Sequence, residues 1–328
     1  MRILVAGGAG YVGSHACKEL AHAGHEPITY DNLSTGHRWA VRWGPLILGD
    51  LADDVALSCA LKEQGVQAVM HFAANAYVGA SVADPRGYYA NNLANSLTLL
   101  NAMLAANLRL LIFSSSCAIF GIQRTALLDE EHIQDPVNPY GETKRAFEQA
   151  LRWYESAYGF RTVALRYFNA AGADPDAETG EDHEPEPHLI PNLLKTAARA
   201  QPYVEIFGDD YPTPDGTAVR DYVHVSDLAS AHVLALNHLV AGGASLRLNL
   251  GTGRGHSVRD VVKAAARVCA AEIPTRLCPR RVGDAPLLVA DGRLAQQTLG
   301  WTPRLSDIET IIHSAWRWHR RRSNGWDP

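Results

Sequence analysis

The chain has 328 residues, a formal net charge of −5 at pH 7, and a composition that is 47% hydrophobic and 20% charged. These values are typical of a globular chain with one large or two moderate domains and an ample core. The negative net charge argues against broad, non-specific binding to nucleic acid. The one basic segment, "WRWHRRR" at 316–322, is expected to close the last helix.

Cysteine content and the first residues bear on the compartment. The five cysteines are odd in number and contain no CxxC pair, which predicts neither a disulfide framework nor a structural zinc site. The chain opens "MRILVAGGAG" without a signal-peptide pattern, and no apolar run reaches membrane-spanning length. We therefore expect a cytoplasmic protein with no membrane or nucleic-acid partner.

The first 24 residues have the pattern strand, glycine loop, helix. A short apolar run at 2–6 is followed by Gly7, Gly10 and Gly13 and then by an amphipathic stretch that ends near Gly24. Glycines at these positions let the backbone approach a pyrophosphate at the amino end of a helix. The pattern predicts a dinucleotide-binding loop.

A second strand, expected at 27–31, ends in Asp31. An acid about 20 residues after the glycine loop is placed to accept hydrogen bonds from the adenosine ribose hydroxyls. Its negative charge repels a 2′-phosphate, and Asn32 rather than an arginine follows it. The sequence therefore favours NAD over NADP.

Strands and helices then alternate through the first half. We expect strands at 45–50, 66–74, 108–116 and 161–167 and helices at 86–107 and 140–158. This alternation predicts an α/β fold with a doubly wound parallel sheet of the Rossmann type. Ligands of such sheets bind at the carboxyl ends of the strands. We assign residues 1–168 to an NAD-binding domain.

Three polar residues in this half suggest acid–base chemistry. Tyr140 and Lys144 are four residues apart at the start of a helix, so their side chains share one face. A free phenol has a pKa near 10 and needs a neighbouring cation to act as a base at pH 7. Ser116, at the end of the strand 108–116, is expected to project into the same crevice.

The second half is less regular, and we assign 169–328 to a smaller, mixed α/β substrate domain, with segments that can cross back to the first. Residues 174–187 carry seven acids and three prolines, typical of a solvated loop. His183 and His188 stand near these acids without tight ligand spacing, so we expect no metal. Helices are expected at 188–200 and 307–322. Gly251, Gly253 and Gly255 resemble a second glycine loop, but no acid-terminated strand follows, which favours a structural turn.

Motifs along nearly the whole chain resemble the extended short-chain dehydrogenase/reductase family and, within it, the UDP-glucose (UDP-galactose) 4-epimerases. The YxxxK motif at Tyr140 marks the superfamily, and the segment from "IFGDDYPT" to "RDYVHV" is specific to sugar-nucleotide 4-epimerases. Further matches are "GGAGYVGSH", "YDNLSTG", "GDLAD", "HFAA", "YYANN", "FSSSCAIFG", "NPYGETK", "LRYFNAAGA", "NLGTGRGHSV" and "PRRVGDAP".

The resemblance implies three sets of site residues. Those expected to be catalytic are Ser116, Tyr140 and Lys144. Those expected to line a tightly held NAD are Gly7, Gly10, Tyr11, Val12, Gly13, Asp31, Asn32, Asp50, Leu51, Phe72, Ala73, Ala74, Asn91, Tyr140, Lys144 and Phe168. Those expected to hold the UDP-sugar are Ser116, Tyr140, Phe168, Asn169, His188, Arg220, Arg281 and Asp284, with both arginines on the diphosphate and Asp284 on the uridine ribose.

The implied reaction is NAD-dependent inversion of the sugar C4 hydroxyl through a 4-keto intermediate, in a protein that the resemblance implies is a homodimer. "HFAANAYVGAS" also resembles the UDP-xylose/UDP-arabinose 4-epimerases, which leaves hexose and pentose open. Leu288 stands where the family gates sugar size, which leaves N-acetylated hexosamines open.

Rival functions on the same fold are a 4,6-dehydratase or decarboxylase and a non-catalytic NAD-binding protein. The first two need an acid just after the strand-end serine, where this chain has Cys117 and Ala118. The third would have no need to keep Ser116, Tyr140 and Lys144 together.

Overall fold

The larger part of the molecule is a seven-stranded sheet in the order β10-β6-β5-β4-β1-β2-β3, with every neighbouring pair parallel. The computed structural model describes residues 1–123, 125 and 127–323, so residues 324–328, the end of the second predicted domain, lie outside the described residues. The strands are β1 (Arg2–Ala6), β2 (Glu26–Asp31), β3 (Leu46–Leu48), β4 (Ala68–His71), β5 (Leu110–Ser116), β6 (Arg161–Tyr167) and β10 (Leu246–Leu250). The predicted doubly wound parallel sheet is confirmed.

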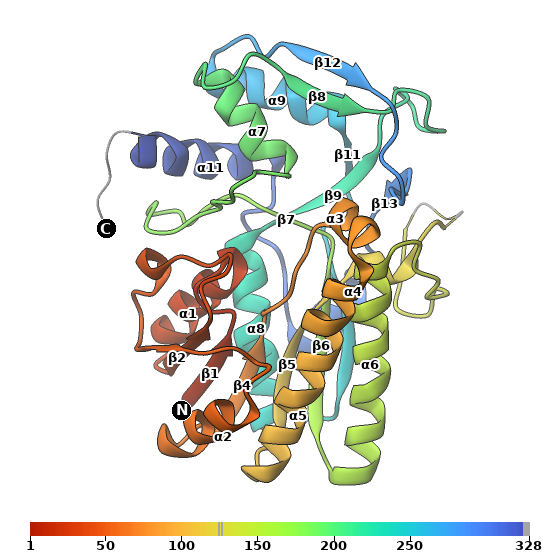
Figure 1. Cartoon of the computed structure of the whole chain (residues 1–328). Coiled ribbons are helices and arrows are strands. Elements are labelled where there is room, and N and C mark those ends of the chain that lie inside the picture. The colour runs from red at the N-terminus through yellow and green to blue at the C-terminus, as the bar shows by residue number, and fades with distance from the viewer. Residues whose placement is uncertain (124, 126, 324–328) are drawn as a thin grey trace.

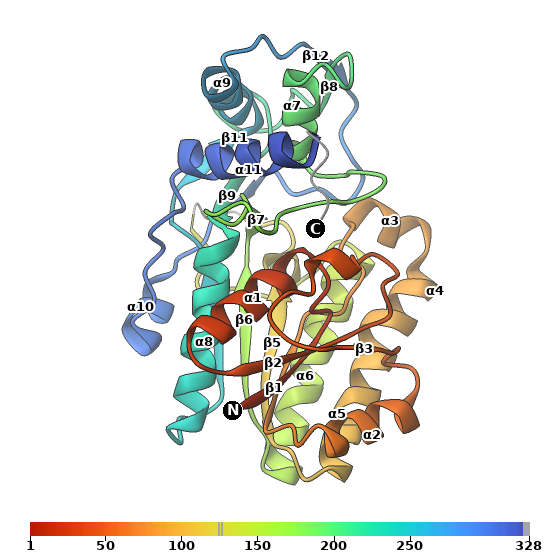
Figure 2. The same ribbon diagram turned by 90° about the vertical axis from the view of Figure 1, so that its left-hand side faces the viewer.

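Helices cover both faces of this sheet, and each face has its own hydrophobic core (Figures 1 and 2). One layer consists of α1 (Tyr11–His22), α8 (Val225–Val240) and α10 (Arg293–Leu299). The other consists of α2 (Asp54–Glu63), α5 (Asn95–Ala105) and α6 (Pro139–Tyr158). The central strands between them are buried on both sides, as their apolar sequences require, whereas the edge strand β3 is partly exposed.

The single helix predicted at 86–107 is wrong in detail. The segment consists of α4 (Pro85–Tyr88), a π-helix (Tyr89–Ala94) and α5. Within the π-helix, the Asn92 side chain donates to the Asn75 carbonyl at 2.9 Å and accepts from the Asn75 N–H at 2.8 Å. These bonds tie the wider helical turn to the chain that leaves β4, and π turns of this kind are common at functional sites.

Three elements of the first sheet and its helix layers, β10, α8 and α10, come from the second half of the chain. Strand β10 pairs with β6, and α8 packs against α1. The chain therefore crosses back to the first sheet after residue 169, and the division into two domains stays a prediction.

The smaller part lies beyond the carboxyl ends of the large sheet (Figure 1). Strands β7 (Asn169–Ala171), β9 (Val219–His224), β11 (Gly255–Ser257) and β13 (Leu287–Leu288) form one small sheet, and β8 (Val204–Phe207) pairs with β12 (Thr275–Cys278). Helices α7 (Leu189–Ala197), α9 (Val258–Cys269) and α11 (Ile308–Ser323) share a third core. Helix α3 (Val78–Ala83) stands at the boundary of the two parts.

The basic segment at 316–322 does end the last helix, where its arginines face the negative end of the helix dipole. Among the described residues, no helix is both long and apolar enough to cross a membrane.

Candidate active site

A cavity of about 1010 Å³ lies between the carboxyl ends of the large sheet and the smaller part. Every residue named above for catalysis, cofactor or substrate lines it, together with Leu288. The volume lies at the upper end of the range for ligand pockets. The fold therefore brings residues from Gly7 to Asp284 to one chamber large enough for extended ligands.

The glycine loop is shaped for close approach. Gly7 has a φ of +81°, and a Cβ atom there would lie 2.5 Å from the Ala73 backbone nitrogen. Helix α1 then begins after Gly10 without a side-chain cap. Its first N–H groups and its positive dipole end are thus available to an anion such as a pyrophosphate.

Asp31 ends β2 at the edge of the same chamber. Its carboxylate accepts hydrogen bonds from the N–H groups of Ala9 at 3.0 Å and Leu33 at 2.8 Å, which fix its position. Burial raises the pKa of this carboxyl, and the two N–H donors oppose the rise. Asn32 donates to the Asp50 carboxylate at 2.7 Å. The Asp31 carboxylate as acceptor and the Asn32 amide as donor fit a dinucleotide whose ribose has a free 2′-hydroxyl.

The start of α6 places the tyrosine–lysine pair. The Asn138 side chain caps the helix by accepting from the Gly141 N–H at 2.8 Å, and Pro139 occupies its first turn. A Cβ atom on Gly141 would lie 2.4 Å from the Ala118 carbonyl oxygen. Glycine therefore lets the first turn of α6 lie directly against the turn that follows Ser116 at the end of β5.

Burial dominates the electrostatics of the pair. The Lys144 ammonium donates to the Ser114 carbonyl at 2.7 Å and lies 4.8 Å from the Phe113 ring centre. Burial lowers the pKa of Lys144 to about 7, with Glu148 opposing the shift. Burial also raises the pKa of Tyr140 to about 12, against a hydrogen bond from Ser116 that lowers it. The chain alone thus disfavours both charged forms.

A buried polar network supports the strand that carries the three serines. Ser114 hydrogen-bonds the Tyr167 hydroxyl, and Ser115 donates to Glu148 at 2.5 Å. Glu148 in turn forms a 2.6 Å ion pair with Arg166, and both side chains are almost fully buried. Removing one partner of such a pair leaves an uncompensated charge, so the network holds β5, β6 and α6 in one arrangement.

The expected substrate residues lie across the chamber on the smaller part. Arg220 on β9 forms an ion pair with Asp284. The family resemblance implies that Arg220 binds the diphosphate and Asp284 the uridine ribose. Arg281 lies over the Phe207 ring at 4.0 Å. His188 precedes α7, and Asn169 begins β7.

Two aromatic residues of the chamber to which the sequence analysis gave no role are Tyr77 and Phe207. Tyr77 contacts the rings of His183 and His188 edge-on, and Phe207 lies under the Arg281 side chain. Phe207 falls inside the "IFGDDYPT" segment, and Tyr77 falls inside "HFAANAYVGAS", so a signal was available for both.

The second glycine segment is a structural turn, as predicted. The N–H groups of Thr252 and Gly253 donate to the Asp221 carboxylate at 2.9–3.0 Å. Amides that would bind a phosphate in a dinucleotide loop are here satisfied by the chain's own acid.

Comparison with known proteins agrees with this geometry. Residues 3–251 match the model of the NAD dependent epimerase/dehydratase family. The UDP-glucose 4-epimerase of Rhizobium meliloti (strain 1021) is 49% identical, over 98% of each chain. The crystal structure of the Brucella ovis UDP-glucose 4-epimerase in complex with NAD is 50% identical, covers 96% of this chain and 97% of that one, and superposes with a TM-score of 0.93.

A third relative was solved with a nucleotide sugar bound. The Stenotrophomonas maltophila UDP-glucose-4-epimerase, solved with NAD and formylated UDP-arabinopyranose, is 40% identical, covers 99% of this chain and all of that one, and has a TM-score of 0.95. The chain belongs to the NAD-dependent epimerase/dehydratase family. The glycine loop and Asp31 are the residues that fit its cofactor, NAD.

Burial of Lys144 predicts a pH-dependent stability cost in protein freed of NAD. The unfolded pKa is near 10.5 and the folded pKa about 7, so between these values only the unfolded chain binds the extra proton. Stability therefore falls as pH decreases from 10.5 to 7 and the cost stays constant below 7. We expect Lys144→Met to raise the free energy of unfolding most at pH 6, with a gap that closes toward pH 10.

Urea unfolding at pH 6, 8 and 10 measures this gap. Lys62→Met, at an exposed position on α2, is the control and should show no such pH-dependent gain. A Lys144→Met gap that is constant or grows with pH would contradict the prediction.

Proposed function

We propose that this chain is an epimerase that interconverts UDP-glucose and UDP-galactose by inverting the sugar C4 hydroxyl, and so serves galactose metabolism. The observation that carries the proposal is the convergence of Ser116, Tyr140 and Lys144 on one chamber with the glycine loop and Asp31. NAD held by the glycine loop and Asp31 would supply a hydride acceptor and donor for the sugar C4.

In this proposal Tyr140 is the acid–base group. As phenolate it takes the proton of the 4-hydroxyl and later gives it back, and Ser116 hydrogen-bonds the sugar 4-oxygen and relays the proton. The pKa of about 12 in the chain alone is too high for this role at pH 7. Protonated Lys144, whose ammonium lies 5.8 Å from the Tyr140 ring centre, and the positive charge of bound NAD both favour the phenolate.

Arg220, Arg281 and Asp284 are proposed to hold the nucleotide half of the substrate. Arginines bind diphosphates through several N–H donors, and Asp284 accepts from ribose hydroxyls. Because Arg220 and Asp284 pair with each other in the chain alone, each already has its charge compensated before the ligand arrives.

Elimination and decarboxylation are disfavoured by the residues after Ser116. Cys117 is buried, and burial raises the pKa of its thiol to about 12. Ala118 has no titratable group. Neither residue can act as an acid or base at pH 7. A UDP-pentose is the second candidate substrate, because the Stenotrophomonas maltophila relative was solved with formylated UDP-arabinopyranose.

Proton NMR of the purified protein with UDP-glucose, UDP-galactose, UDP-xylose, UDP-arabinose and the UDP-N-acetylhexosamines tests the reaction without added NAD. We expect UDP-glucose and UDP-galactose to interconvert fastest among these sugars. We expect the reaction to proceed without added NAD, because in this proposal the chamber retains its cofactor between cycles. Faster turnover of the pentoses would assign the second candidate. If no sugar is inverted even with added NAD, the epimerase assignment fails.

Tyr140→Phe tests the acid–base role. Loss of the hydroxyl should lower kcat by about 10²–10⁴-fold, because the proton of the 4-hydroxyl has no acceptor. Bound NAD, followed by its absorbance after denaturation, should remain. Tyr158→Phe, at the other end of α6 and half exposed, is the matched control with unchanged kcat. Comparable activity in Tyr140→Phe and Tyr158→Phe would exclude the role.

We further propose a homodimer that contacts through α6. Trp153 on this helix is 76% exposed, which is unusual for so large an apolar side chain in a monomer. Light scattering should give twice the chain mass, and Trp153→Glu should shift it toward the monomer, whereas Val240→Glu on the exposed side of α8 should not. A monomeric wild-type protein would overturn this proposal.

We propose a cytoplasmic location because none of the cysteines, all of which the structure describes, forms a disulfide bond. All five are free thiols, and Cys59 is exposed, which fits a reducing compartment.

A further inference from the structure

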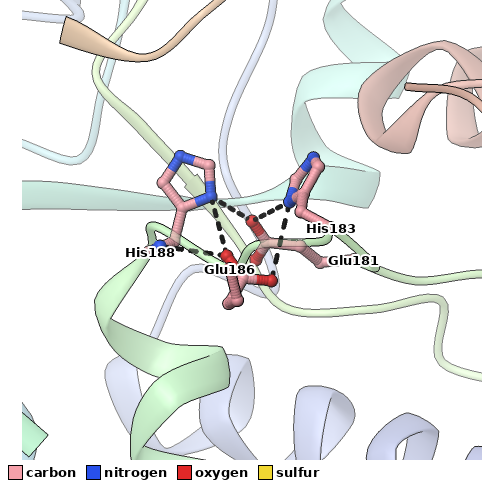
Figure 3. Close-up of side chains that lie close together, drawn as sticks. All are labelled: Glu181, His183, Glu186 and His188. Atoms are coloured by element: carbon pink, nitrogen blue, oxygen red, sulfur yellow. Dashed lines mark hydrogen bonds and ion pairs between the residues drawn. The ribbon is translucent and has the colours of Figure 1, made fainter. Parts of the chain in front are cut away.

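Four potential metal ligands meet in the segment between β7 and α7, at the wall of the chamber. They are Glu181, His183, Glu186 and His188, whose ligand atoms all lie within 4.8 Å of one another. In Figure 3 the Nδ1 atoms of the two imidazoles face the two carboxylates. The Glu181 and Glu186 side chains are only 8% and 3% exposed, so the carboxylates are held away from water.

The separations fit one small cation better than a set of hydrogen bonds. His183 Nδ1 lies 3.4 Å from Glu181 and 3.6 Å from Glu186, and His188 Nδ1 lies 3.4 Å from Glu186. A tetrahedral Zn²⁺ with ligand bonds of about 2.0–2.1 Å holds its ligand atoms about 3.3 Å apart. Among the four histidine–glutamate separations, the 2.5 Å contact between His188 and Glu181 is the one that would have to open.

His183 supplies an independent indication. Its Nδ1 atom is fully buried and points at two carboxylates, but it makes no hydrogen bond and meets them only as ion pairs at 3.4 and 3.6 Å. A buried polar atom that makes no hydrogen bond is rare in folded proteins, and each such atom calls for a ligand, an ion or a water. An imidazole nitrogen aimed between two carboxylates is a donor set that zinc accepts.

A second acid cluster on the same segment shows how this fold compensates a group of neighbouring carboxylates, of which Asp174 is buried. Asp174, Asp176 and Glu178 surround the Lys18 ammonium at 2.8–3.1 Å. Their cation is thus built into the chain. The ion pairs of Glu181 and Glu186, in the part of the chain that the structure describes, are with His183 and His188 alone.

We propose that Glu181, His183, Glu186 and His188 bind a divalent transition-metal ion, with Zn²⁺ as the best match. Four protein ligands complete a tetrahedral shell, which defines a structural site without an open position for substrate. The ion fixes the segment 181–188 and, through ring contacts of both histidines, Tyr77 at the wall of the chamber. The sequence expectation of no metal followed from linear spacing, which does not show that a turn brings the four together.

The proposal does not depend on the reaction, so the test measures the metal content of the protein rather than its turnover. The full chain is expressed without an affinity tag, purified without chelator, and analysed for metals by mass spectrometry. We expect about one zinc per chain. After chelation and gel filtration, added ZnCl₂ should restore that content and raise Tm by about 5 °C or more.

Variants locate the ion. His183→Ala and Glu186→Gln should lower zinc content about tenfold and abolish the zinc-dependent rise in Tm. Asp176→Asn removes a charge from the same segment but leaves the four ligands, so its zinc content should equal that of the wild type. Wild-type protein that holds no stoichiometric metal and whose Tm ignores ZnCl₂ would overturn the proposal and leave the cluster as an imidazolium–carboxylate network. Equal zinc loss in Asp176→Asn and His183→Ala would also overturn it.

Discussion

The close contact between the first turn of α6 and the turn after β5 is the constraint on which the rest of the site depends. The absent side chain of Gly141 lets the Ala118 carbonyl lie against the helix backbone. This contact fixes the separation between Ser116 on the strand and Tyr140 and Lys144 on the helix. Beneath it, the Glu148–Arg166 pair joins the same helix to β6. A parallel sheet supplies the shared edge, but this packing sets how the helix residues stand relative to the strand residues.

Burial gives the site its chemistry at a cost in stability. A lysine with a pKa of about 7 and a tyrosine with a pKa of about 12 are both shifted away from the charges that acid–base work requires. The two charged forms stabilise each other only when both exist together, and a cationic cofactor tips the balance toward the phenolate. On the proposed mechanism, the chain therefore becomes active on binding NAD rather than beforehand. Such sites commonly reduce the stability of the fold that carries them.

Local patterns in the sequence were sufficient where the chemistry lies within one element. The glycine loop, Asp31 and the Tyr140–Lys144 spacing each depend on one strand or helix and were readable directly. Contacts between distant segments could not be predicted from such patterns. Strand β10 joins the edge of the sheet beside β6, although it begins 79 positions after β6 ends (246 − 167), and Arg220 pairs with Asp284, which is 64 positions away. The π-helix at Tyr89–Ala94 was missed because the sequence shows no change in periodicity there, and the bond from Asn92 to Asn75 that ties this turn to the chain after β4 joins residues 17 positions apart.

The chamber wall opposite Ser116, Tyr140 and Lys144 is the part of the site that we expect to set which sugar this chain accepts. The residues proposed for the reaction and for the cofactor come from the large sheet and its helices, whereas Tyr77, His188 and Leu288 come from the boundary and the smaller part. The segment that precedes this part of the wall is tied to α1 through the buried pair of Lys18 and Asp174, and the wall itself contains the two histidines and two glutamates. On the proposed function, a wall held by these ionic contacts resists the movement that a larger sugar would require. We therefore expect the substrate range to depend on the rigidity of this segment as well as on the size of any single side chain.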